Sequence, residues 1–351
     1  MRERDLIIIG AGPAGLSAAK IALEAGLTVA IFDRGLDYGG QLNKQTHKFF
    51  GSEKQYAKTR GIDIAKILFT ELAPYGERLE IHLEATVVGL YQDYVVTVLQ
   101  NEDYRRYRAK AIVIATGASE KMLAFANNDL PGVYGAGAVQ TLMNQYGVIP
   151  GKEIIMVGSG NIGLIVSYQL LQAGVKVKAL VEAAPTIGGY KVHAAKLRRL
   201  GVPILTSTTV KAALGENAVE KAVLVSLDED WNEIPGSERE IYADAICIAV
   251  GLSPLHQLLS MAEIEMRYIP ELGGLVPKIS DSLETSMKGV FVAGDVTGIE
   301  EASSAMVEGA LAGLSAAHSL GQTHLDHESL EQDFKSQLQC LRCGPCGLKT
   351  R

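Results

Sequence analysis

Two stretches of the chain repeat one pattern: an apolar strand, a glycine-rich turn, a helix, a glycine stop and a second strand that ends in an acidic residue. They are residues 7–33, IIIGAGPAGLSAAKIALEAGLTVAIFD, and residues 155–182, IMVGSGNIGLIVSYQLLQAGVKVKALVE. Superposing the two copies aligns two sets of glycines: Gly10, Gly12 and Gly15 with Gly158, Gly160 and Gly163. This order is typical of a βαβ unit that binds a dinucleotide.

Each turn position suits a dinucleotide for a physical reason. The first glycine allows the tight turn out of the strand, the second lets the backbone approach a pyrophosphate, and the third lets the helix pack on the strand. The free N–H groups at the helix N-terminus attract the diphosphate. Asp33 and Glu182 follow at the spacing expected for an acid that binds ribose hydroxyls. Two such units in one chain predict two dinucleotide sites.

The acidic balance of the chain disfavours several classes of protein. The net charge is −7 with an isoelectric point near 5.6, which argues against nucleic-acid binding and against a polybasic membrane anchor. The N-terminus lacks the apolar core of a signal peptide, and no apolar run has the length of a membrane helix, so we expect a cytoplasmic protein.

Further apolar strands that end in glycine turns lie between and after the two copies. They are residues 111–117, 245–251 and 289–295. Residues 303–320 are rich in small apolar residues and predict a helix, whereas residues 322–339 are polar and predict an exposed helix or a linker. The pattern is that of an α/β protein throughout.

These motifs resemble those of the flavoproteins with two dinucleotide-binding domains, the superfamily that includes thioredoxin reductase. The resemblance covers about residues 5–320 and rests on these segments: GAGPAG (10–15), GGQL (39–42), ATG (115–117), GSGNIG (158–163) and AGD (293–295). It implies an α/β fold with two Rossmann-like domains, the NAD domain inserted into the FAD domain. The implied boundaries are 1–118 and 246–325 for the FAD domain, 119–245 for the NAD domain, and 326–351 for a polar linker and cysteine-rich tail.

Two further segments resemble a narrower branch of that superfamily. LPGVYGAGAVQTL (130–142) and YGVIPGK (146–152) are similar to the FAD/NAD subunits of sarcosine oxidase, octopine and nopaline oxidase, and hydrogen cyanide synthase. Members of this branch are multi-subunit oxidoreductases that act on amines and amino acids. The resemblance implies a second redox subunit or a small electron-carrier protein as partner, and an amine or amino acid handled through that partner.

The resemblance assigns cofactor-binding roles in both domains. In the FAD domain the assigned residues are Gly10, Gly12, Pro13, Ala14, Gly15, Asp33, Arg34, Gly40, Gln41, Leu42, Ala115, Thr116, Gly117, Gly251, Gly294, Asp295, Glu301, Ala302 and Ser303. In the NAD domain they are Gly158, Gly160, Asn161, Ile162, Gly163 and Glu182. Asp33 is expected to bind the adenosine ribose and Asp295 a ribitol hydroxyl, with a simple turn role as the alternative for Asp295. The helix that starts near residues 301–304 is expected to direct its N-terminus at the flavin pyrimidine.

Glu182 bears on the choice of nicotinamide cofactor. An acid at this position binds the free 2′-hydroxyl of NAD and repels the 2′-phosphate of NADP. The residues that follow, 183–186, include no arginine to bind such a phosphate. We therefore expect NAD rather than NADP, with a solvated strand end as the alternative role of Glu182.

The cysteine positions argue against disulfide reduction through a dithiol, the best-known chemistry of this superfamily. They leave open a metal-binding or redox role for the cysteines near the C-terminus. Residues 35–60 and 120–150, where the resemblance would place a redox dithiol, contain no cysteine, and Cys247 lies alone inside an apolar strand. The other three have the spacing of the first ligands of a ferredoxin-type cluster: Cys340, Cys343 and Cys346. An iron–sulfur cluster, a zinc site, a redox dithiol and an inert tail all stay open.

Residues 45–60 mix basic and aromatic side chains directly after the flavin-proximal glycines. We predict His47 and Lys44 as catalytic candidates in this region, with His47 as a proton donor. The alternative is a packed loop with a solvated charged face.

The sequence thus predicts an FAD- and NAD-dependent oxidoreductase. Hydride passes between nicotinamide and flavin, and the electrons are exchanged with a second redox centre or a partner subunit, in a complex that acts on an amine or amino acid. Two alternatives stay open: a free-standing NADH-dependent reductase of a small electron carrier, and a non-catalytic nucleotide-binding subunit. The sequence is also compatible with association of several copies of the chain.

Overall fold

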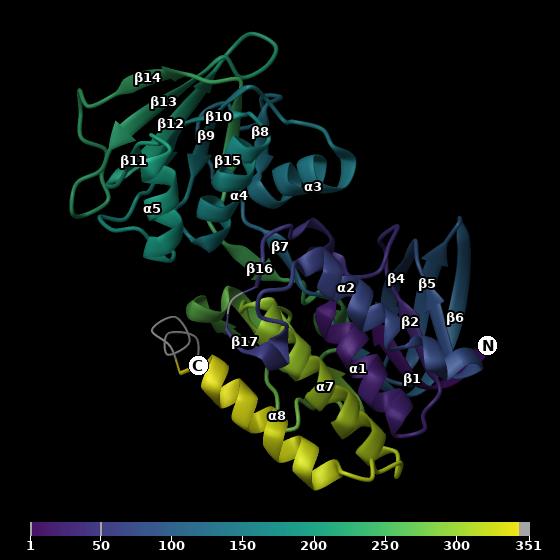
Figure 1. Cartoon of the computed structure of the whole chain (residues 1–351). Helices are drawn as coiled ribbons and strands as arrows, with labels where there is room; N and C mark the ends of the chain where they lie inside the picture. The colour runs from purple at the N-terminus through teal and green to yellow at the C-terminus, as the bar shows by residue number, and fades with distance from the viewer. Residues whose placement is uncertain (1, 50, 344–351) are drawn as a thin grey trace. The chain divides into compact units, whose positions relative to one another are not determined.

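The computed structural model describes residues 2–49 and 51–343 (Figure 1). The chain divides into two compact units: unit 1 comprises Met1–Ser119 and Ser253–Arg351, and unit 2 comprises Glu120–Leu252. Unit 2 is continuous in sequence and interrupts unit 1. The two Rossmann-like cores and the insertion of one domain into the other confirm the predicted fold class.

Unit 1 is built on a sheet with the strand order β3-β2-β1-β6-β5-β4, in which β19 also pairs with β6. The parallel strands are β1 (Arg2–Ile9), β2 (Val29–Phe32), β3 (Leu79–His82), β6 (Asp103–Ile114) and β19 (Val290–Val292). Two antiparallel strands extend the sheet: β4 (Ala85–Leu90) and β5 (Val95–Gln100). The β1–α1–β2 connection is the predicted first βαβ unit.

Both faces of this sheet are buried. On one face, Leu6 and Ile8 pack with the helices α1 (Pro13–Glu24), α2 (Gly61–Thr70) and α7 (Ala302–Ser319). On the other face, Ile7 and Ile9 pack with β5 and with α6 (Gln257–Met261). Since successive side chains of a strand point to opposite faces, burial on both sides explains why β1 is a continuous apolar run.

The register of unit 1 brings the ends of its strands together. Ile9 lies opposite Phe32 of β2 and Ile114 of β6, and Val292 of β19 also lies opposite Ile114. The residues that follow these strands therefore meet at one edge of the sheet, its carboxyl edge. Ligands of open parallel sheets bind at this edge.

Unit 2 repeats this arrangement with the strand order β11-β10-β9-β15-β8, all parallel. The strands are β8 (Val133–Gly135), β9 (Glu153–Val157), β10 (Lys176–Val181), β11 (Ile204–Leu205) and β15 (Ala245–Ile248). The helices α3 (Ala136–Tyr146), α4 (Asn161–Gln172) and α5 (Lys191–Arg199) cover one face. The antiparallel sheet β12 (Thr208–Leu214), β13 (Lys221–Ser226) and β14 (Arg239–Tyr242) covers the other.

Two short strands mark the crossings between the units. β7 (Ala118–Glu120) and β16 (Leu252–Pro254) pair with each other. The smaller elements of unit 1 are η1 (Gly40–Lys44), η2 (Glu53–Gln55), η3 (Ala73–Arg78), η4 (Pro270–Leu272), β17 (Met266–Ile269) and β18 (Gly274–Pro277).

The polar segment near the C-terminus forms the helix α8 (His327–Leu341), which lies along α7 in Figure 1. Leu338 is 5% exposed and belongs to the apolar core that α7 shares with α1, and the partly buried Phe334 packs against that core. Phe334 and Leu330 also pack against a smaller apolar cluster of α1 and α7. These apolar side chains recur at four-residue spacing, so they line one face of the helix. The segment is therefore a docked helix rather than a linker.

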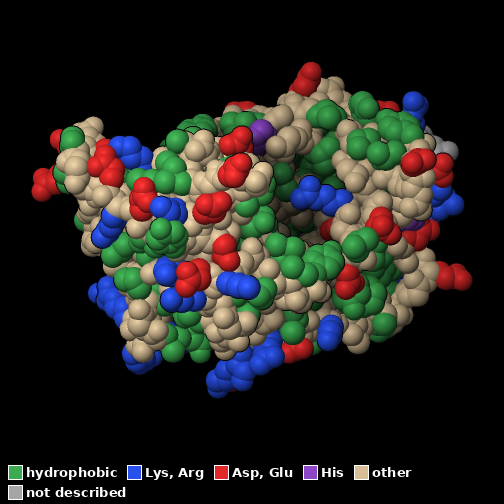
Figure 2. Space-filling model, turned by 90° about the horizontal axis from the view of Figure 1, so that it is seen from above, with side chains coloured by type: hydrophobic (Ala, Val, Ile, Leu, Met, Phe, Trp, Pro, Cys, Tyr) green, Lys and Arg blue, Asp and Glu red, His purple; other side chains and the backbone are tan. Residues whose placement is uncertain are grey.

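Charged side chains of both signs are distributed over the surface. On the face in Figure 2, acidic and basic side chains are interspersed among apolar ones. Many of them form ion pairs, such as Lys211 with Glu233 and Glu238. Within the part of the chain that the structure describes, no helix is both long enough and apolar enough to span a bilayer.

Candidate functional site

The first glycine turn, residues 10–15, joins β1 to α1 and is closely packed. Gly10 has a φ of +112°, and a Cβ there would lie 2.3 Å from the carbonyl oxygen of Ala115. A Cβ on Gly15 would lie 1.8 Å from the carbonyl oxygen of Gly10. A Cβ on Gly12, by contrast, would meet no protein atom within 4 Å. The turn therefore needs glycine for its own packing at two positions and leaves open space at the third, where Pro13 then begins the helix.

Asp33 fixes this turn from the end of β2. Its Oδ2 accepts a hydrogen bond of 2.6 Å from the N–H of Ala11, and its Oδ1 accepts one of 2.7 Å from the N–H of Gly35. The carboxylate is thereby held beside the open side of Gly12, as an acid that binds a ribose requires. The neighbouring Arg34 is exposed.

The glycine pair 39–40 closes onto the first turn. The N–H of Gly39 donates to the carbonyl of Ala11 at 2.7 Å, and a Cβ on Gly40 would lie 3.0 Å from the Cα of Gly12. In the short helix η1 that follows, Leu42 is fully buried in the core and Gln41 is exposed. The predicted GGQL motif therefore contributes backbone and one exposed side chain at this edge, while Leu42 anchors it.

The segments after β6 and β19 reach the same edge. Ala115 donates its N–H to the carbonyl of Ile9 at 2.8 Å, and the N–H of Ala293 donates to Ile114 at 3.1 Å. The hydroxyl of Thr116 donates to the carbonyl of Leu255 at 2.8 Å, and Gly117 follows in a left-handed conformation with φ +72°.

Asp295 lies in the turn between β19 and α7. Its Oδ1 accepts a hydrogen bond from the N–H of Glu300 at 3.3 Å. Burial raises the pKa of Asp295 to about 7, and the nearby charges of Glu308 and Glu300 act in the same direction. Glu301 then caps α7, and Ala302 and Ser303 form its first turn.

Three features of unit 1 fit a dinucleotide with a polar sugar chain. The open space at Gly12 admits a diphosphate beside the N-terminus of α1. The carboxylate of Asp33 is oriented toward that turn. Asp295 is a half-buried carboxyl group in the turn before α7, and a carboxyl oxygen can accept a hydrogen bond from a ribitol hydroxyl.

The second glycine turn, residues 158–163, repeats the packing of the first. A Cβ on Gly158 would lie 2.3 Å from the carbonyl oxygen of Ala249, and one on Gly163 would lie 2.1 Å from the carbonyl oxygen of Gly158. Gly160 again faces open space, with no protein atom within 4 Å of its Cβ position. Ile162 is exposed at this edge, with 41% of its surface accessible.

Glu182 occupies the position of Asp33 in unit 2. Its Oε2 accepts hydrogen bonds from the N–H of Ser159 at 2.8 Å and from the Ser159 hydroxyl at 2.5 Å. Its Oε1 accepts one from the N–H of Ala184 at 3.0 Å. Ser159, the middle residue of Gly-Ser-Gly, was not among the predicted site residues, although its place between the two glycines could have indicated it.

The structural repeat extends further than the sequence repeat. The N–H of Gly189 donates to the carbonyl of Ser159 at 2.8 Å, as Gly39 does to Ala11. The N–H of Gly188 donates to the Ser159 hydroxyl at 3.0 Å, and Asn161 accepts a hydrogen bond from the N–H of Tyr190 at 2.9 Å. The Gly188-Gly189 pair therefore closes the second turn, and its likeness to Gly39-Gly40 is the sequence signal for it.

Gly251 follows β15 in unit 2. It has a φ of +119°, it is exposed, and its carbonyl accepts a hydrogen bond from the N–H of Lys121 at 2.9 Å. Both residues belong to unit 2. The role of Gly251 as a cofactor contact stays a prediction.

The two catalytic candidates lie on the loop after η1. Lys44 is the last residue of η1, and the ring of His47 stacks on Phe49 with 5.9 Å between centroids. Both side chains are half-buried. The loop is tied by a bridge between Lys48 and Arg60. Their catalytic roles stay predictions.

The predicted cysteine site is not supported. Cys340 lies in the last turn of α8 and Cys343 follows it, both exposed and free, whereas Cys346 lies outside the described residues. Within residues 2–49 and 51–343, no group of three or more His, Cys, Asp and Glu side chains could hold a metal ion. Cys247 is fully buried in β15, and burial raises the pKa of its thiol.

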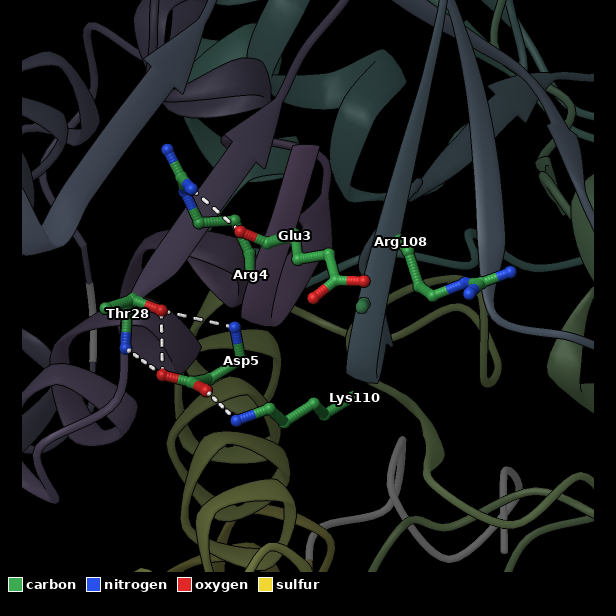
Figure 3. Close-up of a pocket in the computed structure, with 7 residues that line it drawn as sticks. Glu3, Arg4, Asp5, Thr28, Arg108 and Lys110 are labelled. Carbon is green, nitrogen blue, oxygen red and sulfur yellow. Dashed lines mark hydrogen bonds and ion pairs between the residues drawn. The ribbon is translucent and has the colours of Figure 1, made fainter. Parts of the chain in front are cut away.

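A shallow pocket of about 310 Å³ lies at the other, amino-terminal end of β1 (Figure 3). Three of its polar residues bond to one another: Asp5 accepts hydrogen bonds from Lys110 at 2.8 Å and from the N–H of Thr28 at 2.9 Å. The pocket is lined by Glu3, Arg4, Asp5, Thr28, Arg108, Ala109 and Lys110. It therefore lies at the edge of the unit 1 sheet opposite the first glycine turn.

Known proteins are similar to this chain in sequence. The alpha chain of sarcosine oxidase from Corynebacterium sp. (strain P-1) is 30% identical over 90% of this chain and 33% of its own length. The A chain of opine oxidase from Rhizobium meliloti is 28% identical over 90% of this chain and 63% of its own length. The chain thus spans between one third and two thirds of these relatives, which confirm the predicted branch.

A solved structure agrees on the fold. The thioredoxin reductase of T. acidophilum superposes with a TM-score of 0.74, at 24% identity, over 91% of this chain and all of that one. The pyridine nucleotide-disulphide oxidoreductase family matches residues 4–309, which include both glycine turns and the acids that fix them. The chain therefore belongs to the pyridine nucleotide-disulphide oxidoreductase family and is an FAD- and NAD(P)-dependent oxidoreductase.

Proposed function

We propose that this chain binds FAD at the first turn and NAD(H) at the second, and exchanges hydride between them. The observation that carries the proposal is the duplicated turn-and-acid arrangement, with Asp33 bonded to the N–H of Ala11 and Glu182 bonded to the N–H of Ser159. When bound, the flavin accepts or donates a hydride and stores two electrons. The residues of the chain bind, orient and electrostatically tune that group.

NAD is the proposed nicotinamide cofactor rather than NADP. Both oxygens of Glu182 accept hydrogen bonds from the chain, which holds the negative charge at the ribose end of the second turn. A 2′-phosphate would meet that charge, whereas a free 2′-hydroxyl could donate to it. The loop that follows supplies neither lysine nor arginine before Lys191.

The N-terminus of α7 is proposed to stabilise the reduced flavin. The helix begins at Ala302 after the Glu301 cap, and no acidic residue lies in its first turn. A positive dipole end favours a group that gains negative charge. Asp295 would accept a hydrogen bond from a hydroxyl of the sugar chain beside it.

We propose a partner subunit for the other half of the reaction. The curated relatives are named as subunits of a sarcosine oxidase and an opine oxidase, and the chain spans only part of each. By this likeness, electrons pass between the flavin and a second redox centre in a complex that oxidises an amine or amino acid. Co-purification of a second redox subunit with the tagged chain tests this part.

The test of the core proposal is an anaerobic absorbance titration of the purified, FAD-reconstituted protein. We expect an oxidised flavin band near 450 nm that bleaches with about one equivalent of NADH, and at least tenfold less efficient bleaching by NADPH. Absence of bound flavin after reconstitution refutes FAD binding. Bound flavin that neither nucleotide reduces refutes the hydride exchange, and equal reduction by the two nucleotides refutes the role of Glu182.

A further inference from the structure

Arg342, the residue after α8, joins two carboxylates of unit 1. Its Nε donates to the two oxygens of Glu300 at 2.9 and 3.2 Å, and its Nη2 donates to Oε1 of Glu308 at 2.5 Å. The Arg342 side chain is 18% exposed, that of Glu300 11% and that of Glu308 2%. An ion pair this enclosed is screened little by solvent, so losing one member leaves an uncompensated buried charge.

Both carboxylate residues are bonded in turn to the segment that holds Asp295. Oε2 of Glu308 accepts hydrogen bonds from the N–H of Gly294 at 2.8 Å and from the Thr297 hydroxyl at 3.0 Å. The N–H of Glu300 donates to Asp295. Arg342 is thus one residue removed from the Gly294-Asp295 turn, to which the proposed function assigns a flavin contact.

The helix α8 is also tied to the loop that follows the GGQL motif. The Nε2 of the buried Gln55 donates to Oε1 of Gln337 at 2.5 Å, and Lys54 pairs with Asp333 at 2.8 Å. The helix and Arg342 therefore contact two separate parts of unit 1 that adjoin predicted flavin-binding residues. This segment lies beyond residue 309, where the family match ends.

We propose that Arg342 is a positioning residue for bound FAD. By compensating Glu300 and Glu308, it holds the 294–301 turn in the conformation that receives the flavin, so FAD binding and docking of the C-terminal helix stabilise each other. The inference rests on the proposed FAD site. Because linkage is reciprocal, bound FAD must also strengthen the attachment of Arg342.

The electrostatics of the turn support this role. Burial raises the pKa of Asp295, and the negative charges of Glu308 and Glu300 raise it further. The guanidinium of Arg342 offsets those two charges from the other side. Removing it adds net negative charge beside the turn, which disfavours a reduced, negatively charged flavin more than the neutral oxidised one.

The experiment compares four full-length proteins reconstituted with FAD: wild type, Arg342→Met, Arg342→Lys and the matched control Lys335→Met. Lys335 lies on the same helix and pairs with Glu331 across one turn. We expect Arg342→Met to weaken the binding of oxidised FAD at least tenfold. The binding of reduced FAD should weaken by a further factor of ten, which lowers the two-electron reduction potential of the bound flavin by about 30 mV. Arg342→Lys restores most of both losses, and Lys335→Met behaves as wild type.

The thermal shift produced by FAD separates positioning from general stability. The inference is overturned if Arg342→Met lowers the melting temperature of the FAD-free and the FAD-loaded protein by the same amount. In that outcome the FAD affinity and the flavin reduction potential also stay at their wild-type values. If Arg342→Met does not fold, hydrogen exchange of the wild type decides: FAD must slow amide exchange in the last turn of α8, around the buried Leu338, at least fivefold. Equal exchange rates with and without FAD overturn the inference. A wild type that binds no FAD instead refutes the proposed function itself.

Discussion

The carboxylate of Glu182 is bonded to both the backbone N–H and the hydroxyl of Ser159, at 2.8 and 2.5 Å. The glycine turn and the acid at the end of the next strand are therefore one unit, in which the turn orients the charge. The same relationship joins Ala11 and Asp33 in the first half of the chain.

Replacing Glu182 by Gln tests whether its charge selects the nucleotide. The amide keeps the shape and loses the negative charge that opposes a 2′-phosphate. We expect the preference for NADH over NADPH in flavin reduction to fall about tenfold, or 1.4 kcal/mol. Rapid-mixing kinetics with both nucleotides give the ratio. Glu216→Gln, on an exposed loop of the same unit, should keep the wild-type ratio; a ratio unchanged in Glu182→Gln contradicts the assignment.

Alanine should have different effects at Gly12 and at Gly15 of the first turn, one on FAD affinity and the other on stability. Gly15→Ala places a Cβ 1.8 Å from a carbonyl oxygen, so we expect a loss of more than about 2 kcal/mol in the free energy of unfolding. Gly12→Ala meets open space, so its stability cost should stay below about 1 kcal/mol while FAD affinity falls at least tenfold. Denaturant unfolding and FAD titration measure the two effects. Normal FAD affinity in Gly12→Ala would show that no diphosphate binds there.

Gly160→Ala is the counterpart in unit 2. Its Cβ also meets open space, so it should weaken NADH without changing FAD affinity or the unfolding free energy by more than about 1 kcal/mol. Measuring the FAD and NADH affinities of both Gly12→Ala and Gly160→Ala shows which cofactor each turn binds. Loss of FAD in Gly160→Ala would reverse the assignment of the turns.

The raised pKa of Asp295 predicts that the free energy of unfolding of the FAD-free protein depends on pH. Its pKa is about 7 in the fold, while an unfolded Asp titrates near 3.9. The folded state therefore binds the extra proton, and this contribution is present below pH 4 and is lost as the pH rises through 7. Asp295→Asn, which cannot ionise, should gain about 2 kcal/mol over wild type between pH 5 and pH 8. Parallel stability curves for the two proteins would contradict the assignment.

The thiols of the chain should differ sharply in reactivity. Cys247 is fully buried and its pKa is raised by burial, whereas Cys340 and Cys343 are exposed. Because the thiolate is the reactive form, iodoacetamide at pH 7.5 should label the two exposed cysteines at least 100-fold faster than Cys247. Mass spectrometry of timed digests measures the rates, and denatured protein is the control. Comparable rates in the native protein would place Cys247 at the surface.

The repeat made most of the fold accessible from sequence, because strand, turn, helix and acid all fall within thirty residues of one another. Their local order specifies a βαβ unit without knowledge of distant contacts. The insertion and the GGQL and AGD segments followed from family likeness. The open space at Gly12 and Gly160 agrees with the role that the pattern assigns to the middle glycine.

Contacts between distant parts of the chain were not accessible in this way. Glu308 and Arg342 meet across the α7–α8 connection, and neither residue belongs to a motif. The spacing of Leu330, Phe334 and Leu338 does carry a signal for a packed helix, and the polar composition of the segment obscured it. The cysteine spacing left a metal cluster open among other roles, and the described residues do not support it, because spacing alone does not supply the remaining ligands.

The pairing of β7 with β16 brings together the two points at which unit 2 is inserted into unit 1. The N–H of Leu255 donates to the carbonyl of Gly117, and the N–H of Lys121 donates to that of Gly251, each at 2.9 Å. The polypeptide thus leaves the first unit and returns to it at adjacent points. A short hairpin turn could bridge that gap, so a gene that joins residue 117 to residue 255 would encode unit 1 as a single uninterrupted domain. The same junction would accept a different nucleotide-binding module, which makes it a natural site for recombination and for the construction of chimeras.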